Sequence, residues 1–233
     1  MITIFAGLQA VRERIAQAAR AASRAPQDVR LLAVGKTFAA GAIRQAHEAG
    51  QIAFGESYLQ EALEKIAALS GLPLEWHFIG PIQSNKTRPI AEHFDWVHSV
   101  DRVKIAERLS QARPAQLGPL QVCLQVNISG EDSKGGVAPQ GVAELARQVS
   151  QLPHLTLRGL MAIPRPSVDP IEQRGQFRQV RQLFEQLNAQ GYALDTLSMG
   201  MSDDLEAAIQ EGATIVRVGS AIFGQRAKSQ GQS

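Results

Sequence analysis

Lys36 directly follows an apolar run, Leu31–Gly35, and this placement is the most distinctive chemical feature of the chain. Such a run predicts a buried strand, so the ammonium group of Lys36 would stand where little water reaches it. Burial lowers the pKa of a lysine and favours the neutral amine that forms a Schiff base with a carbonyl. The alternative is a strand-end lysine whose stem is buried and whose charge reaches solvent.

Two segments near the C-terminus have the composition of a phosphate site, Ser198–Ser202 and Arg217–Ser220. Each comes at the end of a predicted strand, and barrel enzymes commonly bind phosphate in the loops after their seventh and eighth strands. Gly200 and Gly219 would allow a ligand to approach the backbone closely. These segments favour the Schiff-base interpretation of Lys36.

Ser202 has two interpretations, because Asp203, Asp204 and Leu205 follow it. It either caps a helix that begins there, or it lies beside backbone donors that face a phosphate. Asp203 and Asp204 would repel a phosphate, so we expect both carboxylates to point outward.

A P-loop is not expected, although Gly35, Lys36 and Thr37 resemble the end of one. That motif requires a further glycine at position 30, which is Arg30, and the residues between suit a buried strand.

The composition is that of a globular protein that does not bind nucleic acid. The chain has 233 residues, 44% hydrophobic and 20% charged, with a net charge of +2 and 5% aromatic residues. Cys123 is the single cysteine and lies in an apolar stretch, which predicts a buried structural thiol. No run is long enough to span a bilayer, and charged residues at 12–14 interrupt any secretory leader. We therefore expect no membrane association, a cytoplasmic location and a monomer.

Short β-like runs alternate with helical patterns along the chain, after an opening amphipathic helix that contains Leu8, Val11 and Ile15. The predicted strands are 30–34, 51–54, 75–79, 96–99, 120–127, 156–161, 196–199 and 214–218. The predicted helices between them are 41–49, 58–69, 85–93, 103–111, 139–151, 173–190 and 203–211.

This alternation predicts an α/β fold, a single (β/α)8 TIM barrel with an extra N-terminal helix. The barrel is expected to occupy residues 1–226, with a polar C-terminal tail at 227–233. A doubly wound open sheet is the competing fold, but it would be better supported by a Gly-x-Gly-x-x-Gly turn after the first strand, which is missing.

On a barrel, the polar residues at the ends of the strands meet at one rim, where such enzymes keep their sites. They are Lys36, Glu56, Ser57, His77, Ser99, Asn127, Met201, Ser202, Arg217, Gly219 and Ser220. A lysine after the first strand that faces a phosphate site after the seventh and eighth matches the dimensions of pyridoxal 5′-phosphate (PLP).

With these features the chain resembles the pyridoxal-phosphate homeostasis protein family, the YggS/PROSC group, over nearly its whole length. The segments that carry the resemblance are 31–37, 54–58, 76–80, 83–86, 126–127, 133–134, 198–203 and 217–224. The chain departs from the family pattern at Gly35, Ser57 and Pro81-Ile82, where the family usually has other residues. These departures concern contacts around the second and third strands, not the lysine itself.

The resemblance implies an alanine racemase-like barrel that holds PLP as an internal aldimine on Lys36. It implies an arginine, Arg217, near the pyridine nitrogen, and phosphate contacts from Met201, Ser202, Gly219 and Ser220. His77 and Asn127, from the same predicted rim, complete the expected set of cofactor contacts.

The expected function is a PLP-binding protein of PLP homeostasis, with little or no turnover. Arg217 does not give up its proton, so beside the pyridine nitrogen it would oppose ring protonation and weaken the electron sink that PLP catalysis needs. Racemases also use a second base, which arrives with an added β-domain. The expected partners are PLP, amino acids and apo PLP-dependent enzymes. A small PLP-dependent amino-acid racemase is the alternative, and a cofactor-free Schiff-base aldolase or a metal hydrolase using His93 and His98 is weaker.

Overall fold

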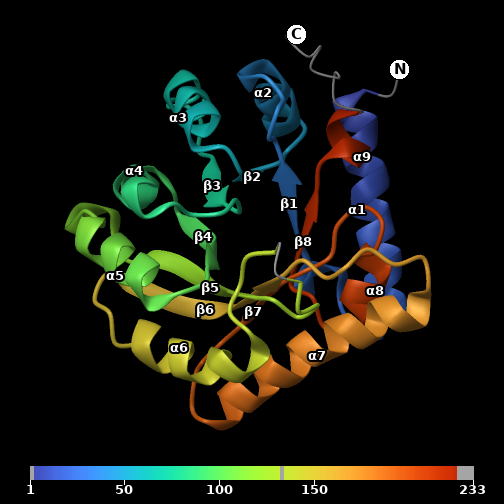
Figure 1. Ribbon diagram of the computed structural model, residues 1–233. Helices are drawn as coiled ribbons and strands as arrows, with labels where there is room; N and C mark the ends of the chain where they lie inside the picture. Colours follow the sequence, from blue (N-terminus) through green and yellow to red (C-terminus); the bar gives the residue numbers. More distant parts are fainter. Residues whose placement is uncertain (1–2, 132–133, 225–233) are drawn as a thin grey trace, which may run out of the picture.

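The computed structural model describes residues 3–131 and 134–224, in which eight parallel strands close into a barrel in chain order (Figure 1). The strands are β1 (Arg30–Val34), β2 (Ala53–Glu56), β3 (Glu75–Phe78), β4 (Trp96–Val100), β5 (Leu120–Val126), β6 (Leu155–Ala162), β7 (Thr196–Ser198) and β8 (Ile215–Val218). β1 pairs with β8, with Leu32 opposite Arg217, so the sheet has no free edge. The predicted barrel is confirmed, and the open sheet is excluded.

Helices surround the barrel and connect successive strands. They are α1 (Ile4–Ala21), α2 (Ala40–Glu48), α3 (Leu59–Ala68), α4 (Thr87–His93), α5 (Val103–Ala112), α6 (Val142–Val149), α7 (Pro170–Ala189), α8 (Leu205–Gln210) and α9 (Ser220–Phe223). Short 3-10 helices add η1 (Pro26–Asp28), η2 (Ser84–Lys86), η3 (Ala115–Leu117) and η4 (Pro139–Gly141).

Some helices begin at residues other than those predicted, for local reasons. α7 begins at Pro170, because the Asp169 side chain accepts a hydrogen bond from Ile171 N and proline suits the first helical position. α8 begins at Leu205, because a turn closed by Met201 and Asp204 occupies the residues before it.

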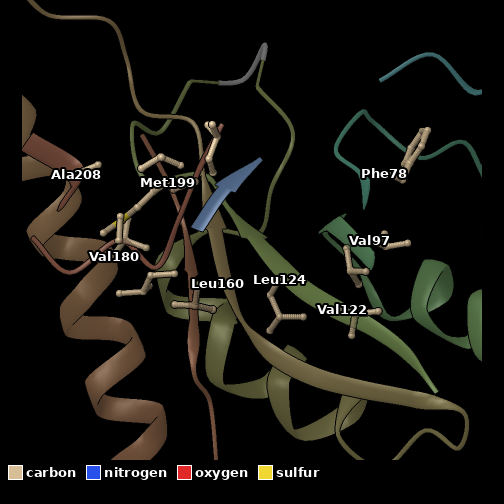
Figure 2. Close-up of a cluster of buried hydrophobic side chains, with 14 of the residues drawn as sticks. Phe78, Val97, Val122, Leu124, Leu160, Val180, Met199 and Ala208 are labelled. Atoms are coloured by element: carbon tan, nitrogen blue, oxygen red, sulfur yellow. The ribbon is translucent and has the colours of Figure 1, made fainter. Parts of the chain in front are cut away.

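The main hydrophobic core lies between the outer face of the barrel and the helices. Alternate strand residues such as Phe78, Val97 and Leu160 point outward and are buried. Figure 2 shows part of this layer, where Val180 of α7 and Ala208 of α8 belong to the same cluster as the strand side chains. This packing fixes the direction in which each strand presents its other side chains, toward the barrel axis.

The barrel interior is more polar than the outer layer. Its apolar part includes a small cluster of Leu32, Ala53 and Ile215, and a second one around Cys123. Cys123 is fully buried there, and burial raises its pKa to about 12, so the predicted inert thiol is confirmed. The remaining interior positions of β3, β4, β7 and β8 hold charged and polar side chains, including His77, His98 and Arg217.

The extra N-terminal helix α1 packs against α8 and α9, on the side of the barrel where the chain closes (Figure 1). Its buried positions include Leu8, Val11 and Ile15, as the sequence predicted. Gly7 allows the close approach, because a Cβ there would lie 2.8 Å from the carbonyl oxygen of Ala221. No helix in residues 3–131 and 134–224 is long and apolar enough to cross a membrane. The predicted end of the barrel at residue 226 and the tail at 227–233 lie outside the described residues.

Candidate functional site

A cavity of about 220 Å³ opens at the C-terminal ends of the strands, and Lys36 lines it. Its other lining residues are Val34, Ser57, Ile79, Ile163, Met201, Ser202, Asp203, Arg217, Gly219 and Ser220. Six of the eight residues predicted to contact a cofactor therefore meet in one place, and they come from β1, β8 and the turns after β7 and β8. The arrangement combines an amine, a guanidinium and several hydroxyl groups.

The peptide groups on both sides of Lys36 are held by an ion-pair cluster formed by Lys65 and Glu61 of α3 and Glu56 of β2. Lys65 Nζ donates to the carbonyl oxygen of Gly35 at 2.7 Å and to Glu61 Oε1 at 2.5 Å. The same Glu61 oxygen accepts from the backbone N–H of Thr37 at 2.6 Å. Thr37 has a positive φ of 69°, a conformation that costs free energy and needs such contacts to persist. The cluster thus fixes where the backbone places Lys36.

Glu56 is the third member of the cluster and the most deeply buried one. Its side chain is fully buried at the end of β2, and Oε1 accepts from Lys65 Nζ at 2.8 Å. Among the described residues, Oε2 has no hydrogen-bond partner. Burial raises the pKa of Glu56 to about 7, against the opposing influence of Lys65 and Lys36.

Arg217 lies on the wall of the cavity with its guanidinium inside the barrel. One nitrogen, Nη1, donates to Ser198 O at 2.6 Å and to Ser198 Oγ at 2.8 Å, and Nη2 donates to Ala162 O at 2.9 Å. Burial lowers the pKa of Arg217 to about 10, with Asp204 opposing the shift, so the group remains a cation at neutral pH. It can only donate hydrogen bonds toward a ligand.

The turn after β7 brings Met201, Ser202 and Asp203 to the mouth of the cavity. Asp204 closes it, because its Oδ1 accepts from Met201 N at 2.6 Å and its own N–H donates to Met201 O at 3.2 Å. The expectation that both aspartates point outward is wrong for Asp204, whose carboxylate turns back to accept from the Met201 amide; Asp203 is exposed and is among the residues that line the cavity. Ser202 does not cap α8, whose N-cap is Asp204.

The segment after β8 supplies Gly219 and Ser220, where the four-residue helix α9 begins. The first amides of a helix have no acceptor within the helix and are available to a ligand. Gly219 also suits a tight fit, because a Cβ there would lie 3.0 Å from Val34 O on the neighbouring strand. The amides of this segment and the hydroxyls of Ser202 and Ser220 are donors of the kind that bind phosphate.

Two residues predicted to contact the cofactor, His77 and Asn127, do not line the cavity. His77 is fully buried in the barrel, and both of its ring nitrogens already have partners, Glu75 and His98. Asn127 Nδ2 donates to Glu131 O at 2.9 Å and to Lys134 O at 3.2 Å, which ties the loop after β5 together. The ring nitrogens of His77 and the amide nitrogen of Asn127 are used within the protein, and among the described residues Asn127 Oδ1 has no hydrogen-bond partner. Neither residue is among those that line this cavity.

The structure brings in residues that the sequence did not single out. Lys65 and Glu61 look like an ordinary surface pair at i, i+4 spacing, and only the 4% exposure of the Lys65 side chain shows their role. Ile163 and Asp203 line the cavity from loops whose paths the sequence does not fix. Histidine, cysteine and carboxylate side chains do not gather into a metal site anywhere in the described residues, and His93 instead contacts Pro89 O.

Residues 7–227 match the family described as alanine racemase, N-terminal domain. The chain is 63% identical over 226 residues to the pyridoxal phosphate homeostasis protein of Pseudomonas aeruginosa, covering 97% of both chains. The chain belongs to the pyridoxal phosphate homeostasis protein family. Another member, from Escherichia coli K12, is 52% identical over 94% of this chain and 95% of its own.

Solved structures agree with this membership in the pyridoxal phosphate homeostasis protein family. PipY of Synechococcus elongatus, solved without PLP, superposes with a TM-score of 0.81 and 42% identity, covering 90% of this chain and 100% of its own. The same protein was also solved with PLP bound, with a TM-score of 0.78. An alanine racemase of Clostridium difficile has a TM-score of 0.70 at 13% identity, over 94% of this chain and 57% of its own, which shows a shared fold.

Proposed function

We propose that this protein binds PLP in the cavity that Lys36 lines and acts in PLP homeostasis as a carrier, with little or no turnover of amino acids. The observation that carries the proposal is the meeting of Lys36, Arg217 and the segments after β7 and β8 around one cavity. Family membership at 63% identity to a PLP homeostasis protein supports it, as does the PLP bound in PipY.

The residues present fit this cofactor by their chemistry. PLP supplies an aldehyde that condenses with a lysine amine, a ring nitrogen and a dianionic phosphate. Lys36 provides the amine, held in place by the Glu56, Glu61 and Lys65 cluster. Ser202, Ser220 and the first amides of α9 offer donors to the phosphate, where Gly219 leaves room.

Arg217 is expected to set the protonation state of the pyridine nitrogen of PLP. A guanidinium donates a hydrogen bond to a pyridine nitrogen and keeps that nitrogen unprotonated, which weakens the ring as an electron sink. Asp203 also lines the cavity, so the phosphate is expected to lie against Ser202, Gly219 and Ser220 and away from this carboxylate. These features suit retention and delivery of PLP better than chemistry on it, so the racemase alternative is not favoured.

Borohydride reduction followed by peptide mass spectrometry tests the assignment of Lys36. The PLP-loaded protein should lose its visible absorption on reduction, and the phosphopyridoxyl mass should map to the peptide that carries Lys36. The variant Lys36→Ala should carry no adduct. The matched control is Lys86→Ala, because Lys86 lines a neighbouring hollow that shares only Ser57 with this cavity. An adduct on Lys86 or Lys134 would refute the assignment.

As a carrier, the protein should also deliver PLP to other proteins. The loaded protein, dialysed to remove free PLP, should restore activity when it is mixed with an apo PLP-dependent enzyme. The borohydride-reduced protein should not. A reduced protein that still restores activity would show that free PLP, and not the carried molecule, reaches the enzyme. The cytoplasmic location and the monomeric state stay predictions from the sequence.

A further inference from the structure

A continuous chain of side-chain hydrogen bonds crosses the barrel interior and ends at Arg217. We call it the barrel relay, and its members are Glu75, His77, His98 and Ser198. Glu75 Oε1 lies 2.5 Å from His77 Nε2, and His77 Nδ1 lies 2.9 Å from His98 Nε2. His98 Nδ1 lies 2.7 Å from Ser198 Oγ, which accepts from Arg217 Nη1 at 2.8 Å. Glu75 begins β3 and Arg217 lies on the cavity wall, so the relay joins the two ends of the barrel.

The chemistry of the two ends fixes the direction of every hydrogen bond in the relay. Glu75 can only accept, because its hydrogen bonds from His77 and Arg30 outweigh burial and lower its pKa to about 2. His77 must therefore carry its proton on Nε2, and with a neutral ring its Nδ1 accepts from His98 Nε2–H. His98 Nδ1 then accepts the Ser198 hydroxyl proton, and Ser198 Oγ is free to accept from Arg217, which can only donate.

This assignment requires both imidazoles to be neutral. Burial lowers the pKa of His77 and of His98, and the positive charge of Arg217 lowers that of His98 further. A proton added to either ring would put a second donor on Ser198 Oγ beside Arg217 and would remove the acceptor of the Ser198 hydroxyl. The neutral relay is the form in which each donor meets an acceptor.

Other charged groups face the relay from the surrounding strands. Arg30 of β1 pairs with Glu75 at 2.8 Å, and Asp95, just before β4, acts on His77 through its charge. Near Arg217 the charged and titratable groups are Asp204 and the protonated thiol of Cys123. Stacking also holds the geometry: the His77 ring is stacked on Trp96, with centroids 5.4 Å apart and an interplanar angle of 8°. Glu75 and Asp95 raise the pKa of His77, but burial, with Arg30 assisting, outweighs them, so its pKa is lowered and the ring stays neutral.

We propose that the barrel relay is a positioning device for Arg217 that couples its cavity-facing donors to the carboxylate of Glu75 at the opposite end of the barrel. The hydrogen bond to Ser198 Oγ engages Nη1 of the Arg217 guanidinium. The remaining N–H groups therefore keep one orientation toward the cavity. Their role toward PLP rests on the function proposed above, but the coupling from Glu75 to Arg217 is a property of the protein alone and is testable without PLP.

The first test uses protein without PLP that is 15N-labelled at histidine and arginine. Two-bond 1H–15N NMR spectra at neutral pH should show His77 and His98 as neutral Nε2–H tautomers with slowly exchanging ring protons. Glu75→Gln, an isosteric change, should shift the His98 ring and the Arg217 side-chain N–H resonances. An Nδ1–H tautomer or a charged ring, or an unchanged Arg217 signal in the variant, would overturn the relay.

The second test is a double-mutant cycle on PLP binding. His98→Leu should weaken PLP affinity by about tenfold, and Glu75→Gln by about threefold, with a shift of about 0.5 in the pH midpoint of the absorption of the loaded protein. In the His98→Leu background, Glu75→Gln should have almost no further effect, because the path to Arg217 is broken. Equal effects of Glu75→Gln in both backgrounds would contradict coupling through the relay.

Asp195→Asn is the matched control for charge at a distance. Asp195 precedes β7 and is ion-paired with Arg158 at 2.5 Å, but it has no hydrogen bond to the relay. It should leave the Arg217 signal, the pH midpoint and the PLP affinity unchanged. If it shifts them as much as Glu75→Gln does, the long-range field and not the relay sets the properties of Arg217. If His98→Leu does not fold, the Glu75→Gln and Asp195→Asn comparison and the NMR spectra still decide the question.

Discussion

Glu56 illustrates how one buried side chain sets the neighbourhood of Lys36. Its carboxylate lies next to Gly35, the residue before Lys36, and it shares the Lys65 ammonium group with Glu61. Gly35 makes room for it, because a Cβ at that position would lie 2.7 Å from Glu56 Oε1. One ammonium group thus serves two carboxylates in a site from which water is largely removed. This arrangement makes the charge on Glu56 costly.

Glu56→Gln should remove a pH dependence of stability from the wild-type protein. The pKa of Glu56 is raised by burial from 4.5 to about 7, so the folded state binds this proton more tightly than the unfolded chain does. The stabilisation is fully present below about pH 4.5 and is lost as the pH rises through about 7. The free energy of unfolding of the wild type, minus that of Glu56→Gln, should therefore fall between these values and stay level above them.

Urea denaturation of both proteins at several pH values between 4 and 8.5 measures this difference. Glu64→Gln is a suitable control, since Glu64 is next to Lys65 on α3 and its contact is an exposed one with Gln60. That control should follow the wild type at each pH. A difference that rises with pH for Glu56→Gln would mean that the ion pair with Lys65 dominates and that the pKa of Glu56 is lowered.

Residue types and strand ends were sufficient to predict that Lys36 and Arg217 lie at one cavity, because a parallel barrel brings its strand ends to one rim. His77, predicted from the same pattern, does not line the cavity, and both of its ring nitrogens are used by Glu75 and His98. The cluster around Lys65 was missed for a different reason. A Glu and a Lys four residues apart on a helix are usually a solvent-exposed pair, and only the packing of α3 against β1 and β2 buries them.

At the scale of elements, α1 supports both halves of the proposed phosphate site. Arg14 donates from Nη2 to Ser202 O at 3.1 Å and forms an ion pair with Glu206 of α8 at 2.8 Å. Farther toward the start of α1, Gly7 packs directly on the carbonyls of Ala221 and Ile222 in α9. The additional helix of this barrel therefore contacts the turn after β7 and the helix after β8 together.

Arg14→Ala should loosen the turn after β7 and weaken PLP binding by roughly three- to tenfold, at a cost in stability of about 1 kcal/mol. The reason is the loss of the hydrogen bond to Ser202 O together with the ion pair to Glu206. Fluorescence titration with PLP and thermal unfolding measure the two effects. Arg20→Ala is the control on the same helix, because Arg20 is 62% exposed and lies 3.8 Å from Glu13. If both variants bind PLP like the wild type, α1 does not position the turn.

The elements themselves were largely predictable, because long periodic segments such as α1 and α7 carry a clear signal. α9 was not predicted, since four residues are too few to show a helical period. The start of α8 was predicted two residues early because Asp203 and Asp204 resemble a first helical turn. In the folded chain the Asp204 carboxylate is used to close the preceding turn instead. Both differences fall at the proposed phosphate site, where the backbone serves the ligand as well as the fold.

At the scale of the whole molecule, the polar residues of the barrel form two groups, one at the rim and one in the interior. The rim around Lys36 opens to solvent through the cavity, whereas the interior holds hydrogen bonds that engage Nη1 and Nη2 of Arg217. Among the described residues that line the cavity, Lys36 is the only amine, and neither histidine nor tyrosine is present. Tyr58 is 55% exposed and lines the neighbouring hollow.

The PLP-loaded protein should therefore exchange the Cα proton of amino acids very slowly. Two requirements of racemisation are poorly met: Arg217 does not transfer its proton to the ring nitrogen, and the described residues that line the cavity include no histidine or tyrosine to act as a second base opposite Lys36. Incubation with L-alanine or L-serine in deuterated water, followed by NMR and chiral chromatography, measures exchange and inversion. Free PLP with the same amino acids is the control, and the protein should exceed its rate only modestly. Deuterium incorporation with accumulation of the D-isomer at about 1 s⁻¹ or faster, as in ordinary enzymes, would contradict the carrier function and favour a racemase.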